Sequence, residues 1–246
     1  MIWIEYAPAA LIALIVTLFA VPPLTALGIE FGWVYQNKRA IAHSATRPVP
    51  YVGGVALLLG LLVAAIFAKW PPEAVGLSIG LVAVFILGVL EDHWPARRRF
   101  WYAGMVVSVV AAIITNQYFA TQIEQLLGPV EVQLSAFSLP ITVVFVGLGV
   151  LGFRTLDRAD GLCDGQALIS ALALTTVAVI LSLQDATARL LPSIAAVTLS
   201  LLGALLGLAF YTYRRPGRRL ATIYLSSAGA MMLGLLVGWL ALQVHG

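Results

Sequence analysis

Long apolar segments separated by short charged loops limit what this chain can fold into. A helix needs about 20 consecutive apolar residues to cross a bilayer, and somewhat shorter segments suffice where neighbouring helices cover their ends. Eight segments meet this description, at residues 9–27, 51–68, 74–90, 100–118, 139–151, 162–183, 190–211 and 221–244. Because 61% of the residues are hydrophobic and only 10% are charged, we predict an all-α polytopic integral membrane protein of about eight transmembrane helices.

The same segments predict a single transmembrane domain over residues 1–246, in which 139–151 is the shortest span. Pro22 and Pro23 should kink or end the first helix, since proline removes a backbone donor and crowds the preceding turn. The first segment follows Glu5 and has no basic leader, so we expect a membrane helix and not a cleavable signal peptide. The one cysteine, Cys163, excludes an internal disulfide.

The distribution of basic residues predicts the orientation. Of the 14 Lys and Arg residues, only Lys69 and Arg189 do not follow an odd-numbered segment. The other 12 are Lys38, Arg39, Arg47, Arg97, Arg98, Arg99, Arg154, Arg158, Arg214, Arg215, Arg218 and Arg219. Positively charged loops stay in the cytoplasm, so we expect both termini to be extracytoplasmic. Functional loops at 37–54, 91–99, 152–165 and 212–229 would then share the cytoplasmic face. For the basic cluster at 214–219, attraction to anionic lipid headgroups is an equally good explanation.

Residues 153–165, F-R-T-L-D-R-A-D-G-L-C-D-G, place five charges within eleven positions. The five are Arg154, Asp157, Arg158, Asp160 and Asp164. Ionised groups that face lipid cost several kcal/mol each, so this stretch must lie at an aqueous face or in a buried polar site.

Three other segments on the predicted cytoplasmic face have recognisable patterns. Residues 43–54 combine prolines with the paired glycines Gly53 and Gly54, which permit close backbone approach. Glu91 and Asp92 end an apolar segment, where adjacent acids can hold Mg²⁺ or act as a general base. A solvated helix end is the alternative for that pair. Residues 221–234, rich in small side chains, would by themselves indicate only helix packing.

Taken together and in this order, the four segments resemble the polyprenyl-phosphate N-acetylhexosamine-1-phosphate transferase family over about residues 37–234. The family pattern H-x-x-x-x-P-x-P-x-x-G-G matches residues 43–54, and its D-D pair falls on Glu91 and Asp92. Its D-G-x-D-G-L falls on 157–162 and its G-D-x-G-S on 226–230. The sequence L-P-I-T-V-V-F-V at 139–146 and the order of the helices also match.

This resemblance implies transfer of a sugar-1-phosphate from a UDP-sugar to polyprenyl phosphate, with Mg²⁺, at the inner (plasma) membrane of a bacterium. Asp92 and Glu91 would be the catalytic residues that activate or orient the lipid phosphate. The substrate-binding residues would be His43, Arg47, Arg154, Asp157, Arg158 and Asp160. Asp157 and Asp160 would also be the metal ligands. We expect the protein to lie in a lipid membrane and to bind no nucleic acid. The sequence does not decide whether it forms a homo-oligomer or binds a partner subunit.

The chain departs from the family pattern at several of these positions. The departures are Leu151 and Arg154 at two asparagines, Arg158 at a glycine, Glu91 at an aspartate and Ser227 at the usual metal-binding aspartate. The family's later cytoplasmic loop with a histidine motif would follow the last residue of this chain. A serine in place of a carboxylate loses the charge that a hard divalent cation prefers.

Two pairs of alternatives follow from these departures. Arg154 and Arg158 either replace Mg²⁺ as the positive charge that faces phosphate, or neutralise the nearby aspartates as internal ion pairs. The protein is either a sugar-1-phosphate transferase, or a non-catalytic member that binds a lipid phosphate or serves as a subunit of an envelope-glycan assembly. A transporter is a third and weaker alternative, because the acids cluster at one face and leave the helix centres uncharged.

Overall fold

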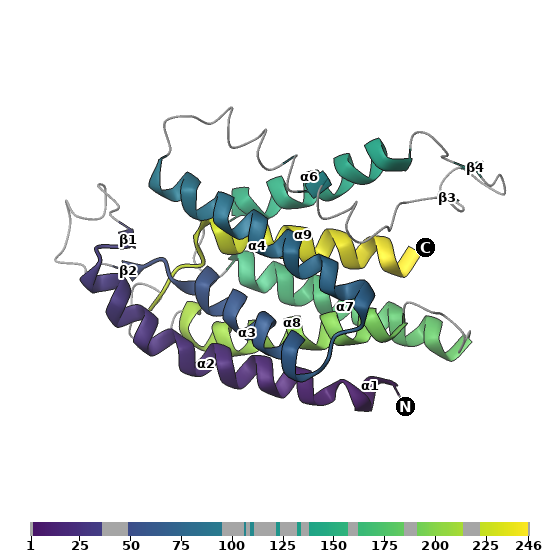
Figure 1. The fold of residues 1–246 in the computed structure, drawn as a ribbon, viewed down its shortest axis with the longest axis horizontal. Helices are drawn as coiled ribbons and strands as arrows, with labels where there is room; N and C mark the ends of the chain where they lie inside the picture. The colour runs from purple at the N-terminus through teal and green to yellow at the C-terminus, as the bar shows by residue number, and fades with distance from the viewer. Residues whose placement is uncertain are drawn as a thin grey trace.

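A computed structural model describes residues 2–35, 49–94, 138–156, 162–184, 191–213 and 222–245. It also describes the isolated residues 106, 109, 110, 122, 123, 132 and 133. The helices in these ranges are α1 (Ile2–Glu5), α2 (Ala7–Glu30), α3 (Gly53–Phe67), α4 (Pro72–His93), α6 (Ser138–Leu156), α7 (Leu162–Gln184), α8 (Leu191–Thr212) and α9 (Ser226–His245) (Figure 1). Two short antiparallel pairs accompany them: β1 (Val34–Tyr35) with β2 (Val49–Pro50), and β3 (Gln122–Ile123) with β4 (Val132–Gln133).

The all-α polytopic membrane fold predicted from the sequence is confirmed. Six described helices are long and apolar enough to cross a membrane, and α3 is a shorter apolar helix. Together these seven coincide with all the predicted segments except 100–118, which lies almost wholly outside the described residues. The total of eight spans therefore stays a prediction, as does the cytoplasmic assignment of the functional loops.

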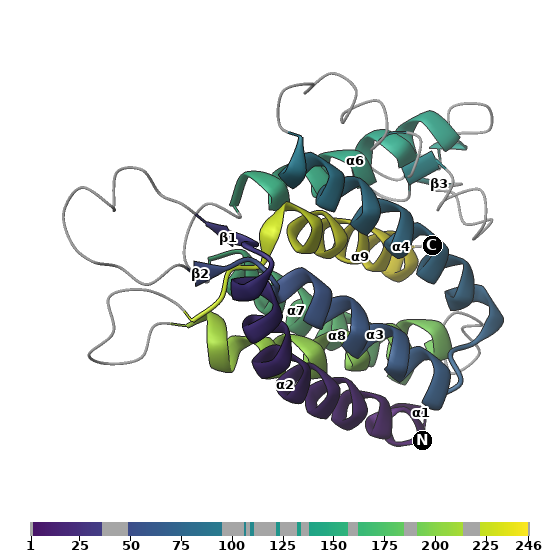
Figure 2. The same ribbon diagram turned by 60° about the vertical axis from the view of Figure 1, so that its left-hand side comes forward.

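The helices α8 and α9 form the centre of the bundle. Figure 2 shows α9 between α4 and α6 on one side and α3, α7 and α8 on the other, with α2 outermost. Most residues of α8 and α9 are buried, whereas α2 and α6 have outer faces lined by exposed apolar residues such as Phe19 and Leu148. Exposed apolar side chains suit lipid contact, so the lipid-facing helices need polar groups only at their ends.

Of the two outcomes expected at Pro22 and Pro23, a kink or an end of the first helix, the end is wrong, because α2 continues through both to Glu30. Proline at 22 leaves the carbonyl of Leu18, four residues earlier, without its usual helical donor. The hydroxyl of Tyr211 on α8 donates to this carbonyl at 3.1 Å. A neighbouring helix thus supplies the missing hydrogen bond, which is how proline is tolerated inside membrane helices.

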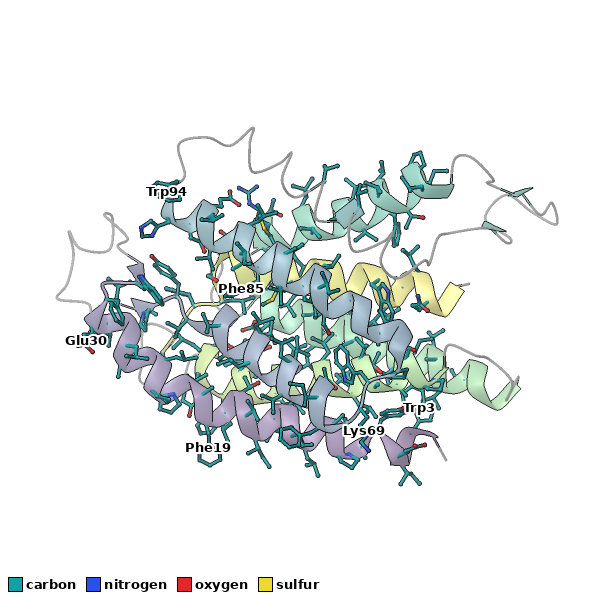
Figure 3. All side chains as sticks on the ribbon, viewed as in Figure 1. Trp3, Phe19, Glu30, Lys69, Phe85 and Trp94 are labelled. Carbon is teal, nitrogen blue, oxygen red and sulfur yellow. The ribbon has the colours of Figure 1, made fainter. Side chains whose placement is uncertain are left out.

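The two ends of the bundle can be told apart by the residues that lie there. Glu30 and Trp94, which end or follow α2 and α4, lie at the end that carries β1 and β2, whereas Trp3 and Lys69 lie at the other (Figures 1 and 3). The start of α1 and the end of α9 both lie near the Trp3 and Lys69 end. The candidate site therefore belongs to a single face of the bundle.

Candidate functional site

The entrances to α3 and α9 are joined by backbone hydrogen bonds. The N–H groups of Gly53 and Gly54 donate to the carbonyls of Tyr224 and Leu225 at 3.0 and 2.8 Å, and the N–H of Tyr224 donates to Pro50 at 3.0 Å. The first N–H groups of a helix have no partner within it, so a segment from elsewhere can pair with them. The 43–54 and 221–234 segments, far apart in sequence, thereby meet at one point.

Glycines allow α3, α4 and α9 to touch backbone to backbone at this junction. A Cβ added at Gly54 would lie 2.8 Å from the backbone nitrogen of Gly229, and one at Gly88 would overlap the backbone of Ala228. The close approach expected at Gly53 and Gly54 is confirmed. Because residues four apart share a helix face, the contact at Gly88 places Asp92 beside the start of α9.

Asp92 caps the N-terminus of α9 from another helix. Its carboxylate accepts hydrogen bonds from the Ser227 hydroxyl and from the backbone N–H groups of Ser227 and Ala228. Ser226 complements this cap, since its hydroxyl accepts from the N–H of Gly229 at 3.4 Å. Ser226 has a left-handed φ of 75°, a conformation that costs a non-glycine residue energy and is common at functional sites. We call Asp92 and Ser226–Gly229 the α9 cap.

Tyr51 lies close enough to Asp92 to sense its charge. Burial and, second, the carboxylate of Asp92 raise the pKa of the Tyr51 phenol above 10.0. Removal of the phenolic proton would place a second negative charge beside Asp92, so Tyr51 stays neutral near pH 7 and can donate a hydrogen bond.

Glu91 points to a different neighbour from Asp92. Its Oε1 forms an ion pair with the guanidinium of Arg154 in the last turn of α6. The Glu91 side chain is 9% exposed and that of Arg154 is 19% exposed. The second carboxylate oxygen of Glu91, Oε2, is buried and has no hydrogen-bond partner among the described residues. Two adjacent acids on α4 therefore bridge to two separate helices, α9 and α6.

These contacts unite part of the predicted site. Glu91, Asp92, Arg154 and Ser227 come together, three of them at positions where the chain departs from the family pattern. The other predicted site residues, His43, Arg47, Asp157, Arg158 and Asp160, lie outside the described residues. Their roles in substrate and metal binding stay predictions.

The described donors do not fit a divalent metal ion. Within the described ranges, no group of three or more His, Cys, Asp or Glu side chains is placed to hold one. Asp92 is engaged by N–H and O–H donors and Glu91 by a guanidinium, whereas Mg²⁺ requires several oxygen ligands in octahedral geometry.

A second buried carboxylate lies at the start of α7. Asp164 is 3% exposed and accepts a hydrogen bond from the Thr212 hydroxyl on α8, while its Oδ1 has no partner among the described residues. Beside it, a Cβ at Gly165 would come within 2.9 Å of the Tyr213 hydroxyl. We call Asp164, Gly165, Thr212 and Tyr213 the α7 start.

Sequence reasoning missed Tyr51 and Ser226 as members of the site. A serine that precedes a small-residue helix is a recognisable N-cap signal, so Ser226 could have been found. Nothing local marks Tyr51, whose role depends on a carboxylate 41 positions later.

Comparison with known proteins places the chain in a family. The model of glycosyl transferase family 4 matches residues 74–245, which is most of the chain, so the protein belongs to this family. A decaprenyl-phosphate N-acetylglucosaminephosphotransferase of Mycolicibacterium smegmatis is 26% identical over 249 residues, covering 95% of this chain and 59% of the relative. A phospho-N-acetylmuramoyl-pentapeptide-transferase of Picosynechococcus sp. is 24% identical over 249 residues, covering 95% and 62%.

The resemblance drawn from the four sequence segments is thus confirmed at the level of the family. The chain spans about three fifths of the length of these relatives. The matched region includes Glu91, Asp92, Arg154 and the α9 cap.

Proposed function

We propose that this protein transfers an N-acetylhexosamine-1-phosphate from a UDP-sugar to polyprenyl phosphate at the inner membrane of a bacterium. The supporting observation is the meeting of Asp92, Arg154 and the start of α9 at one end of an apolar bundle. Relatives of this family carry names that describe phosphotransfer to decaprenyl phosphate. A site at the end of membrane helices suits a lipid substrate whose phosphate lies at the membrane surface.

The reaction joins two anionic substrates. A phosphate oxygen of the lipid forms a bond to the sugar-linked phosphorus of the UDP-sugar, the bridging bond of the diphosphate breaks, and UMP leaves. The main demands on the protein are to align the attack and to stabilise negative charge. Arg154 offers positive charge for this purpose.

Asp92 is the residue we propose to receive or orient the proton of the lipid phosphate. An ionised carboxylate has about four acceptor positions, and α9 occupies three of them with hydrogen bonds. One position remains for a phosphate hydroxyl. The α9 cap fixes the orientation of the carboxylate, as general-base chemistry requires.

A transfer assay tests this proposal. Purified protein in lipid nanodiscs is given sugar-labelled UDP-N-acetylglucosamine and either decaprenyl or undecaprenyl phosphate, with Mg²⁺ or with EDTA. We expect label to enter the lipid fraction and Asp92→Asn to reduce the rate at least about 100-fold, because the base is lost. Gly147→Ala is the control, since a Cβ there would meet nothing within 4 Å. Absence of transfer by the natural chain in every condition would refute the proposal for these substrates.

A second candidate is a non-catalytic member of the family that binds a lipid phosphate, alone or with a partner subunit. The Glu91–Arg154 ion pair favours it, because an internal partner occupies the guanidinium that a substrate would use. Binding of polyprenyl phosphate without any transfer, and gain of transfer in Ser227→Asp with Mg²⁺, would support this candidate over the first.

A further inference from the structure

We propose that Arg154 is the phosphate-binding cation of the site, that Glu91 holds it until phosphate displaces the carboxylate, and that this binding needs no divalent ion. This inference rests on the proposed function, which brings a phosphate group to the site. It predicts that Arg154 raises the affinity for phosphate and that Glu91 lowers it.

The first support is the supply of positive charge. Lys69 and Arg154 are the Lys and Arg residues within the described ranges, and Lys69 lies at the opposite end of the bundle (Figure 3). Among the residues that the structure describes, Arg154 is therefore the full positive charge at the site. Its side chain keeps 19% of its surface exposed, so a ligand at the bundle end can reach it.

The second support is the geometry of the ion pair. Arg154 contacts Oε1 of Glu91, while Oε2 stays buried without a partner among the described residues. Arginine binds a carboxylate best when both oxygens are engaged side by side, and this pair engages one. A phosphate offers more oxygens and more charge than a carboxylate, so it can compete with Glu91 for the guanidinium of Arg154.

The third support is that Asp92 does not compete for Arg154. Its carboxylate takes three hydrogen bonds from Ser227 and Ala228, so the α9 cap offsets part of the cost of burying that charge without a cation. Arg154 can leave Glu91 without disturbing the cap. The described carboxylates also do not form a cluster of three or more that would need a metal ion to balance its charge.

The disagreement with a metal site points the same way. A phosphate can be neutralised by a divalent ion or by a guanidinium, and the described donors suit the second. Ser227 contributes a hydroxyl that donates to Asp92, where a metal site would need a ligand oxygen free to face the ion.

The test measures binding of two phosphate ligands to the protein, residues 1–246, in nanodiscs. Decaprenyl phosphate and UDP-N-acetylglucosamine are titrated separately, each with EDTA and with Mg²⁺. The separate titrations show whether Arg154 binds the phosphate of the lipid or that of the nucleotide sugar. Three proteins are compared: the natural chain, Glu91→Gln, and the double variant Glu91→Gln with Arg154→Gln. The double variant avoids leaving Glu91 buried as an unpaired charge, and its melting temperature is recorded to verify folding.

With EDTA, we expect Glu91→Gln to bind one of the two ligands about tenfold more tightly than the natural chain, because the competing anion is gone. The double variant should bind that ligand at least about tenfold more weakly than Glu91→Gln, while both variants stay folded. If binding requires Mg²⁺ and the two variants bind equally, this inference is wrong and the proposed function survives. If neither ligand binds in any condition, both the proposed function and this inference are wrong.

Discussion

Two helices at the same end of the bundle begin beside a carboxylate, which is half-buried at α9 and buried at α7, and the hydrogen bonding of the two carboxylates differs. The start of α9 receives Asp92 from α4 and supplies three hydrogen bonds to it. The start of α7 carries its own Asp164, which has the Thr212 hydroxyl as donor and a buried Oδ1 without a described partner. A carboxylate near a helix N-terminus is favourable in both places, yet among the described residues Asp92 has three hydrogen bonds and Asp164 has one donor.

The backbone packing differs in the same way. At the α9 cap, glycines are pressed against backbone atoms that cannot move aside, whereas Gly165 at the α7 start faces the mobile end of Tyr213. The α9 cap is therefore a rigid holder for a charged group. The α7 start holds a carboxylate that has a single described donor.

The largest expected effect is on packing. Gly88→Ala should lower the free energy of unfolding by about 3 kcal/mol, since its Cβ would overlap the backbone of Ala228 and force α4 away from α9. Gly165→Ala should stay within about 1 kcal/mol, because the Tyr213 hydroxyl can turn away. Thermal unfolding in detergent measures both. Equal melting temperatures for the two variants would end the comparison.

The next effect concerns the carboxylates. Asp92→Asn should cost about 2 kcal/mol, because an amide group replaces an ionised acceptor of three hydrogen bonds. Asp164→Asn should be neutral or slightly stabilising, because it removes a buried charge that has a single described donor. Denaturant unfolding of the two variants beside the natural chain gives the difference. A larger loss from Asp164→Asn would reverse our interpretation of the two regions.

Removal of single donors sharpens the same contrast. Ser227→Ala leaves Asp92 with two backbone donors, so we expect a loss of about 0.5 kcal/mol. Thr212→Val should cost more, about 1 to 2 kcal/mol, because it leaves Asp164 without a described donor. The Thr212 hydroxyl also donates to the Leu208 carbonyl, 3.3 Å away, so we expect a loss of stability at the lower value, about 1 kcal/mol. If Ser227→Ala proves the more damaging change, the cap depends on its hydroxyl.

The smallest expected effect appears only at alkaline pH. Burial and Asp92 raise the pKa of Tyr51 in the folded state, so the folded protein holds this proton more tightly than the unfolded chain does. The stabilisation is complete below about pH 10 and is lost as pH rises through the folded-state pKa. Tyr51→Phe should lose less stability than the natural chain between pH 9 and about pH 11. Parallel melting curves across that range would show no difference if neither burial nor Asp92 raised the pKa of Tyr51.

Much of the fold could be predicted from apolar length alone. Seven predicted segments coincide with described helices because the bilayer requires a run of apolar residues and helical hydrogen bonding in each, both of which are local properties. The prolines of α2 show where local reasoning fails. Their effect was decided by Tyr211, which lies on another helix and almost 190 positions away.

The candidate site divides along the same line. The amino-acid sequence was enough to predict a polytopic membrane protein and four candidate functional segments, because hydropathy and motif spacing are local properties of the chain. No sequence pattern showed that Asp92 binds the start of α9 while its neighbour Glu91 binds Arg154, because these contacts depend on how the helices pack. The reason is that adjacent side chains leave a helix about 100° apart, so their partners are chosen by which helices pack on each side.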